Sequence, residues 1–130
     1  MKKENCIFCK ISLGEIPSYK VYEDEDFFGF LTIKPHTKGH TLLIPKTHFD
    51  EILVTDDKVV EKIFLTGKNF AKKIKEKFNP DKVAFVVAGQ GVPHLHLHLI
   101  PMNTESDLNP EKAYESTREE LLEIQEILAN

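Results

Sequence analysis

Three histidines, His94, His96 and His98, alternate with leucines in residues 93–101. Because side chains alternate between the two faces of a strand, these imidazoles are expected on one face, with neighbours about 6 to 7 Å apart. An imidazole near neutral pH can bind a metal, or act as a nucleophile whose tautomer its neighbours fix. A polar, solvent-facing row is the simpler alternative, but half of the chain's six histidines lie here. The spacing therefore favours a functional site.

A glycine pair directly precedes this row, in Gly89, Gln90, Gly91 and Val92. Glycines let the backbone approach a ligand and present N–H groups to an anion, and Gln90 adds a side-chain donor. A Gly-x-Gly pattern alone is more often only a turn. Its position immediately before the histidines favours a phosphate-binding loop beside a nucleophile.

Cys6 and Cys9 are the only two cysteines in the chain. Their spacing supplies half of a tetrahedral zinc site, whose remaining two ligands would have to be histidines. Two idle thiols are the alternative. A redox pair is less favoured, because the motif precedes the first expected strand instead of following one. The spacing therefore favours zinc binding, and nothing in the sequence indicates an organic cofactor.

Length and charge limit the other possibilities. The chain has 130 residues, which is the size of a single domain (1–130), so an active site must lie inside one core or between two copies. The net charge of -4 argues against a long nucleic acid as the main partner, although a small phosphorylated ligand fits. No apolar run is long enough for a membrane span or a signal peptide, so we expect a cytoplasmic protein with no membrane partner.

The elements that would position these residues alternate between strand and helix. Aromatic or β-branched runs bounded by turns predict strands at residues 19–24, 27–33, 40–45, 83–88 and 93–101. The continuous apolar run at 83–88 is expected to be buried on both faces. Helical spacing predicts one long amphipathic helix over 56–78, and a C-terminal helix that begins near Thr117 and runs through Leu128. The fold class is α+β, with helices packed on an antiparallel sheet.

The histidine row, preceded by Gly89-Gln90 and followed by Leu99-Ile100-Pro101, resembles the signature of the histidine-triad family of nucleotide hydrolases and transferases. Further similar segments lie at residues 6–11, 14–17, 21–24 and 38–48. The likeness covers roughly residues 6–101. It implies the family's fold and a two-fold homodimer with a nucleotide pocket beside the histidine strand.

The resemblance also implies a mechanism. His96 would attack the α-phosphorus of a nucleoside phosphoramidate, an adenylate or a dinucleotide polyphosphate, giving a nucleotidyl-histidine that water hydrolyses. His98 would contact the phosphate, and His40 and His94 would complete the histidine network. The expected partner is a purine nucleotide or a nucleotide conjugate.

The remaining site residues follow from the same likeness. Apolar side chains would form the base pocket, namely Phe8, Ile11, Phe30 and Ile33, although each has the character of a core residue. Thr32 stands at the ribose position, and backbone donors around the phosphate would come from residues 89–92. Zinc-bearing bacterial relatives suggest a tetrahedral site made by Cys6, Cys9, His48 and His94, whose distance from the nucleophile would make the zinc ion structural.

Two departures from the family pattern keep other functions open. Thr32 replaces the usual aspartate, and Gly91 replaces the usual serine or threonine, so an acceptor for the ribose and a hydroxyl donor for the phosphate are lost. A catalytically weak nucleotide-binding or protein-interaction module with the same fold is one alternative. A metalloenzyme that uses the histidine row itself as a catalytic metal site is another. Residues 103–109 are a further candidate region for substrate selection.

Overall fold

The computed structural model describes residues 3–88 and 91–129. Within these residues five strands form one sheet: β1 (Tyr19–Glu23), β2 (Phe27–Leu31), β3 (Thr41–Pro45), β4 (Lys82–Val86) and β5 (Leu97–Met102). The α-helices are α1 (Ile7–Ser12), α2 (Asp57–Phe78) and α3 (Arg118–Ala129). Short 3₁₀ turns follow β3 and β5: η1 (Ile52–Val54), η2 (Glu105–Leu108) and η3 (Pro110–Lys112).

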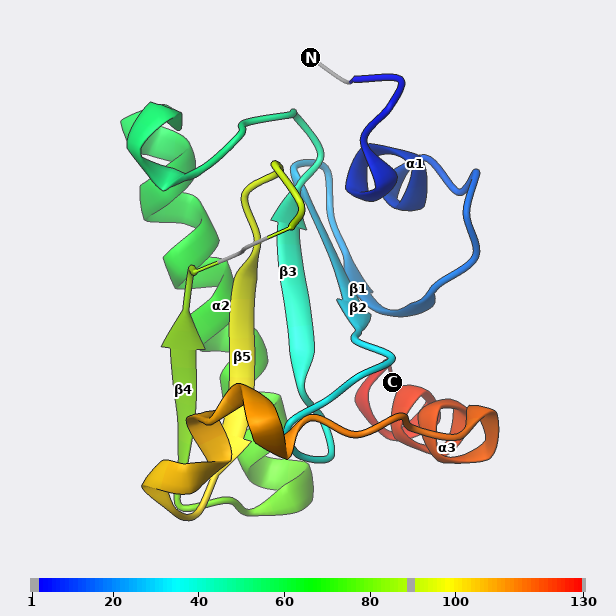
Figure 1. Cartoon of the computed structure of the whole chain (residues 1–130). Coiled ribbons are helices and arrows are strands. Elements are labelled where there is room, and N and C mark those ends of the chain that lie inside the picture. The colour runs from blue at the N-terminus through cyan, green and yellow to red at the C-terminus, as the bar shows by residue number, and fades with distance from the viewer. Residues whose placement is uncertain (1–2, 89–90, 130) are drawn as a thin grey trace.

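The sheet is antiparallel throughout, in the order β1-β2-β3-β5-β4 (Figure 1). β4 therefore joins the sheet beside β5 although α2 separates β4 from β3 in sequence. The predicted α+β class, with one long helix and a C-terminal helix, is confirmed.

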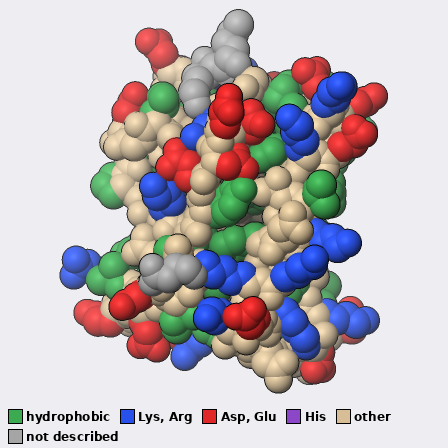
Figure 2. All heavy atoms as spheres, turned by 180° about the vertical axis from the view of Figure 1, so that it is seen from behind, with side chains coloured by type: hydrophobic (Ala, Val, Ile, Leu, Met, Phe, Trp, Pro, Cys, Tyr) green, Lys and Arg blue, Asp and Glu red, His purple; other side chains and the backbone are tan. Residues whose placement is uncertain are grey.

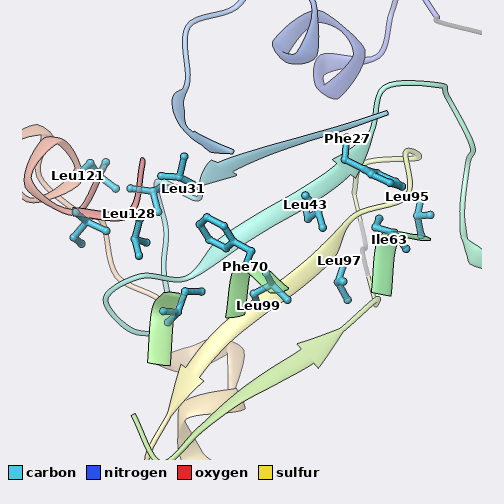
Figure 3. Close-up of a cluster of buried hydrophobic side chains, with 13 residues drawn as sticks. Phe27, Leu31, Leu43, Ile63, Phe70, Leu95, Leu97, Leu99, Leu121 and Leu128 are labelled. Carbon is cyan, nitrogen blue, oxygen red and sulfur yellow. The ribbon is translucent and has the colours of Figure 1, made fainter. Parts of the chain in front are cut away.

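One face of the sheet packs against α2 and α3. Apolar residues recur along α2 at helical spacing, and its buried positions include Ile63, Phe70 and Ile74. They meet leucines of β3 and β5, and the leucines of α3 extend the same cluster toward β1 and β2 (Figure 3). Because Leu97 and Leu99 point into this cluster, the histidines between and before them are directed to the other face.

The opposite face carries a second apolar cluster under α1, a helix that the sequence analysis did not predict. Its buried members are Cys6, Phe8, Cys9, Ile11, Phe28, Phe30, Leu42 and Ile44. The Cys6 side chain caps α1 by accepting a hydrogen bond from the backbone N–H of Cys9. Six residues of helix cannot be recognised by periodicity, so this element is fixed by packing and by its cysteines.

Two strand predictions need correction. The run at 83–88 is not buried on both faces: β4 ends at Val86, lies at the edge of the sheet and leaves Phe85 36% exposed. The strand expected over 93–101 begins only at Leu97, where its pairing with β3 begins. Upstream, the N–H of Leu95 donates to the carbonyl of Phe49 instead. Thus His94 and His96 precede β5, and only His98 lies within it.

The C-terminal region folds back over the sheet. In Figure 1 the orange η2–η3 segment crosses in front of the end of β5, before the chain continues to α3. Thr117 accepts a hydrogen bond from the N–H of Glu120, as the expected cap of α3 requires. The rear view shows Lys and Arg interspersed with Asp and Glu, so the charge of that face is mixed (Figure 2). Among the described residues, no helix has the length and apolar character needed to cross a membrane.

Candidate active site and metal centre

The sheet places His98 in a row of residues that crosses four strands. Phe30 is paired with Leu42, Leu42 with His98, and His98 with Val86. Neighbouring strands lie about 4.8 Å apart, so Phe30 stands two strands from His98 on one side and Val86 one strand away on the other. The histidine thus separates an aromatic region over β2 from a second region over β4.

Hydrogen bonds define the tautomers of the two coupled histidines. The backbone N–H of His36 donates to Nδ1 of His40 at 3.1 Å, so Nδ1 of His40 carries no proton. A neutral His40 ring is therefore protonated at Nε2, which lies 2.9 Å from Nδ1 of His98 and donates to it. The proton of a neutral His98 ring is then on Nε2. A backbone amide thus sets the donor that His98 presents.

His96 is oriented by a different backbone group. Its Nδ1 lies 2.7 Å from the carbonyl oxygen of His94, and because a carbonyl can only accept, Nδ1 carries the proton. The lone pair of the neutral ring is consequently on Nε2. The ring is 6% exposed and is held between Phe8, at 5.1 Å between ring centroids, and His98, at 5.0 Å. This is the arrangement that a nucleophilic imidazole requires.

Burial keeps these rings neutral. Desolvation lowers the pKa of His40 to about 3, with smaller contributions from the neighbouring His98 and His36 charges. Desolvation and the charge of His96 lower the pKa of His98 to about 4, and burial also lowers the pKa of His96. The tautomers derived above therefore apply at neutral pH.

A cavity of about 570 Å³ opens beside His96 and His98. Its walls come from β4, β5, the turn before β3 and the η2–η3 segment. The lining residues are His36, Val86, Ala88, His96, His98, Ile100, Leu108 and Pro110. The cavity thus lies on the Val86 side of the row, away from Phe30.

A separate cluster brings together the two cysteines and two histidines. The ligand atoms of Cys6, Cys9, His48 and His94 all lie within 4.8 Å of one another. Nδ1 of His94 is 3.2 Å from Sγ of Cys6, and Nδ1 of His48 is 3.3 Å from Sγ of Cys9. In a tetrahedral site with Zn–S of about 2.3 Å and Zn–N of about 2.0 Å, a sulfur and a nitrogen are separated by about 3.5 Å. These distances therefore fit zinc.

Outer hydrogen bonds turn both imidazoles toward the thiols. Nε2 of His94 donates to the carbonyl oxygen of Pro45 at 2.9 Å, and Nε2 of His48 donates to Asp50 at 2.7 Å. Each ring then has its Nδ1 lone pair on the cysteine side, as metal ligation requires. A protein carbonyl or carboxylate on the second nitrogen is the usual support of a zinc-binding histidine.

The structure divides the predicted histidine set between two centres. His96 and His98 line the cavity, and His40 hydrogen-bonds His98. The His94 ring, which is fully buried, belongs to the cysteine cluster, and His94 contributes its carbonyl to His96. The three imidazoles of the sequence motif therefore do not form one row, because the strand begins after His96. β5 and the residues just before it thus carry both a member of the cysteine cluster and the rings beside the cavity.

The predicted substrate-binding residues lie in several environments. Phe8, Ile11 and Phe30 are buried in the cluster under α1, while Ile33 is 62% exposed beyond the end of β2. None of these four lines the cavity described above. Phe8 nevertheless contacts both Phe30 and His96 edge to face.

The remaining predicted substrate contacts are those expected at the ribose and the phosphate. Thr32 is half-buried, and its hydroxyl accepts a hydrogen bond from the N–H of Lys34. Gly91 has a φ of 95°, which favours glycine, and Val92 packs against the cluster under α1. Gly89 and Gln90 lie outside the described residues.

Six cavity residues were missed by the sequence analysis as individual site residues, namely His36, Val86, Ala88, Ile100, Leu108 and Pro110. His36 lies in an expected turn, and Leu108 and Pro110 belong to the C-terminal 3₁₀ segment. Leu108 does fall in residues 103–109, which were considered for substrate selection. His36 had one available signal, since it is a further histidine only four positions before His40.

The five-stranded antiparallel sheet, the hydrogen-bonded His40–His98 pair and the Cys₂His₂ cluster together define a histidine-triad protein with a cluster of the kind that binds zinc. The HIT domain model matches residues 13–105, and the chain belongs to the HIT family. "Protein hit" of Bacillus subtilis is 44% identical over 109 residues, which are 80% of this chain and 75% of that protein.

Two further relatives are informative. Adenosine 5'-monophosphoramidase HNT1 of Saccharomyces cerevisiae is 39% identical over 101 residues, covering 77% of this chain and 64% of the yeast protein. The crystal structure of a Zn-bound histidine triad family protein from Mycobacterium smegmatis has a TM-score of 0.82 at 32% identity, covering 96% of this chain and 91% of that one. The family resemblance stated from sequence is confirmed.

Proposed function

We propose that this protein is a nucleotidyl hydrolase or transferase that cleaves at the α-phosphate of nucleoside phosphoramidates or related nucleotide conjugates. The observation that carries the proposal is the orientation of His96, whose Nδ1 proton is bound by a backbone carbonyl and whose Nε2 lone pair is available beside a cavity. The relation to a yeast adenosine 5'-monophosphoramidase supports the same chemistry.

The reaction proceeds in two displacements. Nε2 of His96 attacks the α-phosphorus, an N–P bond forms, and the bond from phosphorus to the leaving group breaks. The leaving atom keeps the electron pair and takes a proton from solvent. Water then attacks phosphorus, the N–P bond breaks with its electrons returning to Nε2, and the nucleotide and a proton are released.

His98 and His40 stabilise the charge that develops on the phosphoryl oxygens. Because His40 holds Nδ1 of His98 as an acceptor, the Nε2–H of His98 is directed as a donor to a non-bridging oxygen. Gly91 and Val92 supply backbone N–H groups to the same charge. The purine would bind on the β2 side of His98, beside Phe8 and Phe30, with its ribose at Thr32.

Cys6, Cys9, His48 and His94 would hold a structural zinc ion. All four positions of the tetrahedron are then protein ligands, so the metal would supply folding stability and a fixed His94 carbonyl. The ion would have no open position for substrate, so it would act on His96 only by holding His94 in place.

The proposal is tested by intact-protein mass spectrometry after brief mixing with adenosine phosphoramidate and an acid quench. Wild type should show a transient mass increase of one adenylate, and the His96→Gly variant should show none while keeping its circular dichroism spectrum. Asn69→Ala, on the exposed surface of α2 and away from the cavity, is the control and should still form the adduct. No adduct and no AMP release from folded wild type would refute the proposal.

A nucleotide-binding module with little turnover is the second candidate. It is favoured by Thr32, which offers one hydroxyl and no charge to the ribose, and by Gly91, which has no side-chain donor. This candidate predicts micromolar binding of AMP by calorimetry without steady-state hydrolysis. Substantial turnover of adenosine phosphoramidate excludes it.

We further propose a homodimer that forms through the open edge of β4. β4 ends the sheet, and its exposed Phe85 stacks on Phe64 of α2 at 6.4 Å between centroids, so an apolar surface adjoins unpaired strand groups. Analytical ultracentrifugation should give twice the mass of the 14.9 kDa chain. Phe85→Glu should shift the distribution to monomer, and a monomeric wild type at micromolar concentration would contradict this assembly.

A further inference from the structure

The cavity beside His96 occupies a different side of the histidines from the proposed nucleoside site. In the row across the sheet, Phe30 lies on the β2 side of His98 and Val86 on the β4 side. An in-line displacement places the leaving group opposite the attacking Nε2, and the nucleoside oxygen must occupy another direction at phosphorus. The β4-side cavity is therefore the place for the leaving group. This step rests on the proposed function.

The cavity wall is mostly aliphatic. Val86, Ala88, Ile100, Leu108 and Pro110 form it together with three histidine rings, and none of its described lining residues is Lys or Arg. Lys112, on the adjoining η3, is paired with Asp107 at 3.4 Å. A polyphosphate leaving group would lose hydration here without a cationic partner, whereas an apolar group would fit.

His36 provides the polar group in this wall. Its Nδ1 lies 2.9 Å from the carbonyl oxygen of Asp107 in η2, and because that oxygen only accepts, Nδ1 is the protonated nitrogen of the neutral ring. Nε2 is then a lone-pair acceptor, and among the described residues none hydrogen-bonds it. The ring also packs edge to face on His40, at 5.0 Å between centroids, which fixes its orientation.

We propose that His36 is a specificity-determining residue for the leaving group, accepting a hydrogen bond at Nε2 from the N–H of an apolar amine held in the β4-side cavity. An amine-linked substrate satisfies this acceptor. In an oxygen ester of the same shape the bridging oxygen carries no hydrogen. The half-buried lone pair on Nε2 of His36 would then face a lone pair of that oxygen and find no donor. Sites of this kind reject the analogue that lacks the donor.

Two substitutions at position 36 separate this role from a merely structural one. His36→Asn keeps a donor near the position of Nδ1, and with it the bond to Asp107, but removes the acceptor at Nε2. His36→Gln keeps an acceptor near Nε2. Both leave the backbone N–H that orients His40 unchanged. A general loosening of the fold would affect amine and ester substrates alike.

The experiment compares the N-benzyl phosphoramidate of AMP with its benzyl phosphate ester, which differ only in N–H against oxygen. We expect the ratio of kcat/KM for amide over ester to fall at least tenfold in His36→Asn and to recover in His36→Gln. Leu108→Ser should lower kcat/KM for both benzyl substrates and leave their ratio unchanged. Circular dichroism and thermal melting confirm that each variant is folded.

The outcomes are distinguishable. If wild type forms the adenylate adduct but the amide-to-ester ratio in His36→Asn stays within twofold of wild type, the assignment of His36 is wrong and the proposed function stands. If folded wild type cleaves neither substrate and forms no adduct, the proposed function fails and this inference fails with it.

Discussion

Nε2 of His40 lies 2.9 Å from Nδ1 of His98, and the direction of this hydrogen bond is set by the backbone N–H of His36 on the far side of the His40 ring. This bond links the turn before β3 to β5. The amide proton of His36 therefore determines which nitrogen of His98 is protonated. Through His40, a backbone amide thereby fixes the nitrogen at which His98 can donate.

His40→Leu should lower kcat by about tenfold or more with a smaller effect on KM. The substitution removes the donor to His98 and leaves its half-buried Nδ1 acceptor unpaired, which costs about 1 kcal/mol or more. His40→Gln, which retains both an amide donor and an acceptor, should recover part of the activity. Steady-state kinetics on adenosine phosphoramidate measure both variants, and equal kcat for His40→Leu and wild type would contradict the role assigned to this bond.

The free energy of unfolding should fall as the pH drops below about 6.5. In the unfolded chain His40 and His98 take up protons near pH 6.5, whereas the folded state resists until pH values near their lowered pKa of about 3 and about 4. Between these limits the unfolded state binds more protons, so stability is lost on acidification and is fully present above pH 6.5.

His40→Gln isolates one contribution to this pH dependence. Between pH 6.5 and pH 5, a histidine with a folded pKa near 3 accounts for about 2 kcal/mol of lost stability. Urea unfolding of both proteins across this range should therefore show a flatter profile for the variant. Because both retain the cysteine cluster, its own pH dependence affects the two alike, and parallel profiles would contradict the prediction.

One zinc ion per chain should be found by elemental analysis of protein purified under reducing conditions. Chelation should lower Tm by about 10 °C or more, because four ligands from three segments are no longer held together. Asp50→Asn loses the carboxylate that orients His48 and should weaken zinc affinity about tenfold or more. Unchanged Tm after complete metal removal would show that the cluster does not need the ion for stability.

Gly67→Ala tests the packing of α2 against β5. A Cβ at this position would lie 2.9 Å from Cδ2 of Leu97, so Leu97 must move, although alanine is the better helix former. Overpacking of this kind costs about 1–3 kcal/mol and should exceed the gain in helix propensity. Asn69→Ala, on the exposed surface of the same helix, should change stability by less than about 0.5 kcal/mol. Chemical denaturation that ranks the two variants equally would contradict this packing argument.

The helices and most strands could be predicted because their signals are local. The apolar residues of α2 recur at a helical period over 22 residues, and β1, β2 and β3 are short β-prone runs between turns. The bounds of β5 could not be predicted, because alternation continues through His94 while pairing with β3 does not. α1 was missed because it is too short for a period and depends on contacts with the sheet.

The sequence by itself determined which residues are candidates for the chemistry: the histidine motif, the two cysteines and His40 are set by residue type and order. Only the tertiary structure decided how they are divided. His94 turns its ring to the thiols and its carbonyl to His96, and His36 joins the site through a carbonyl 71 positions away. Hydrogen bonds to backbone groups decide to which centre each histidine belongs. Strand pairing and the return of the C-terminal segment bring those backbone groups to the histidines, and no local sequence pattern encodes either.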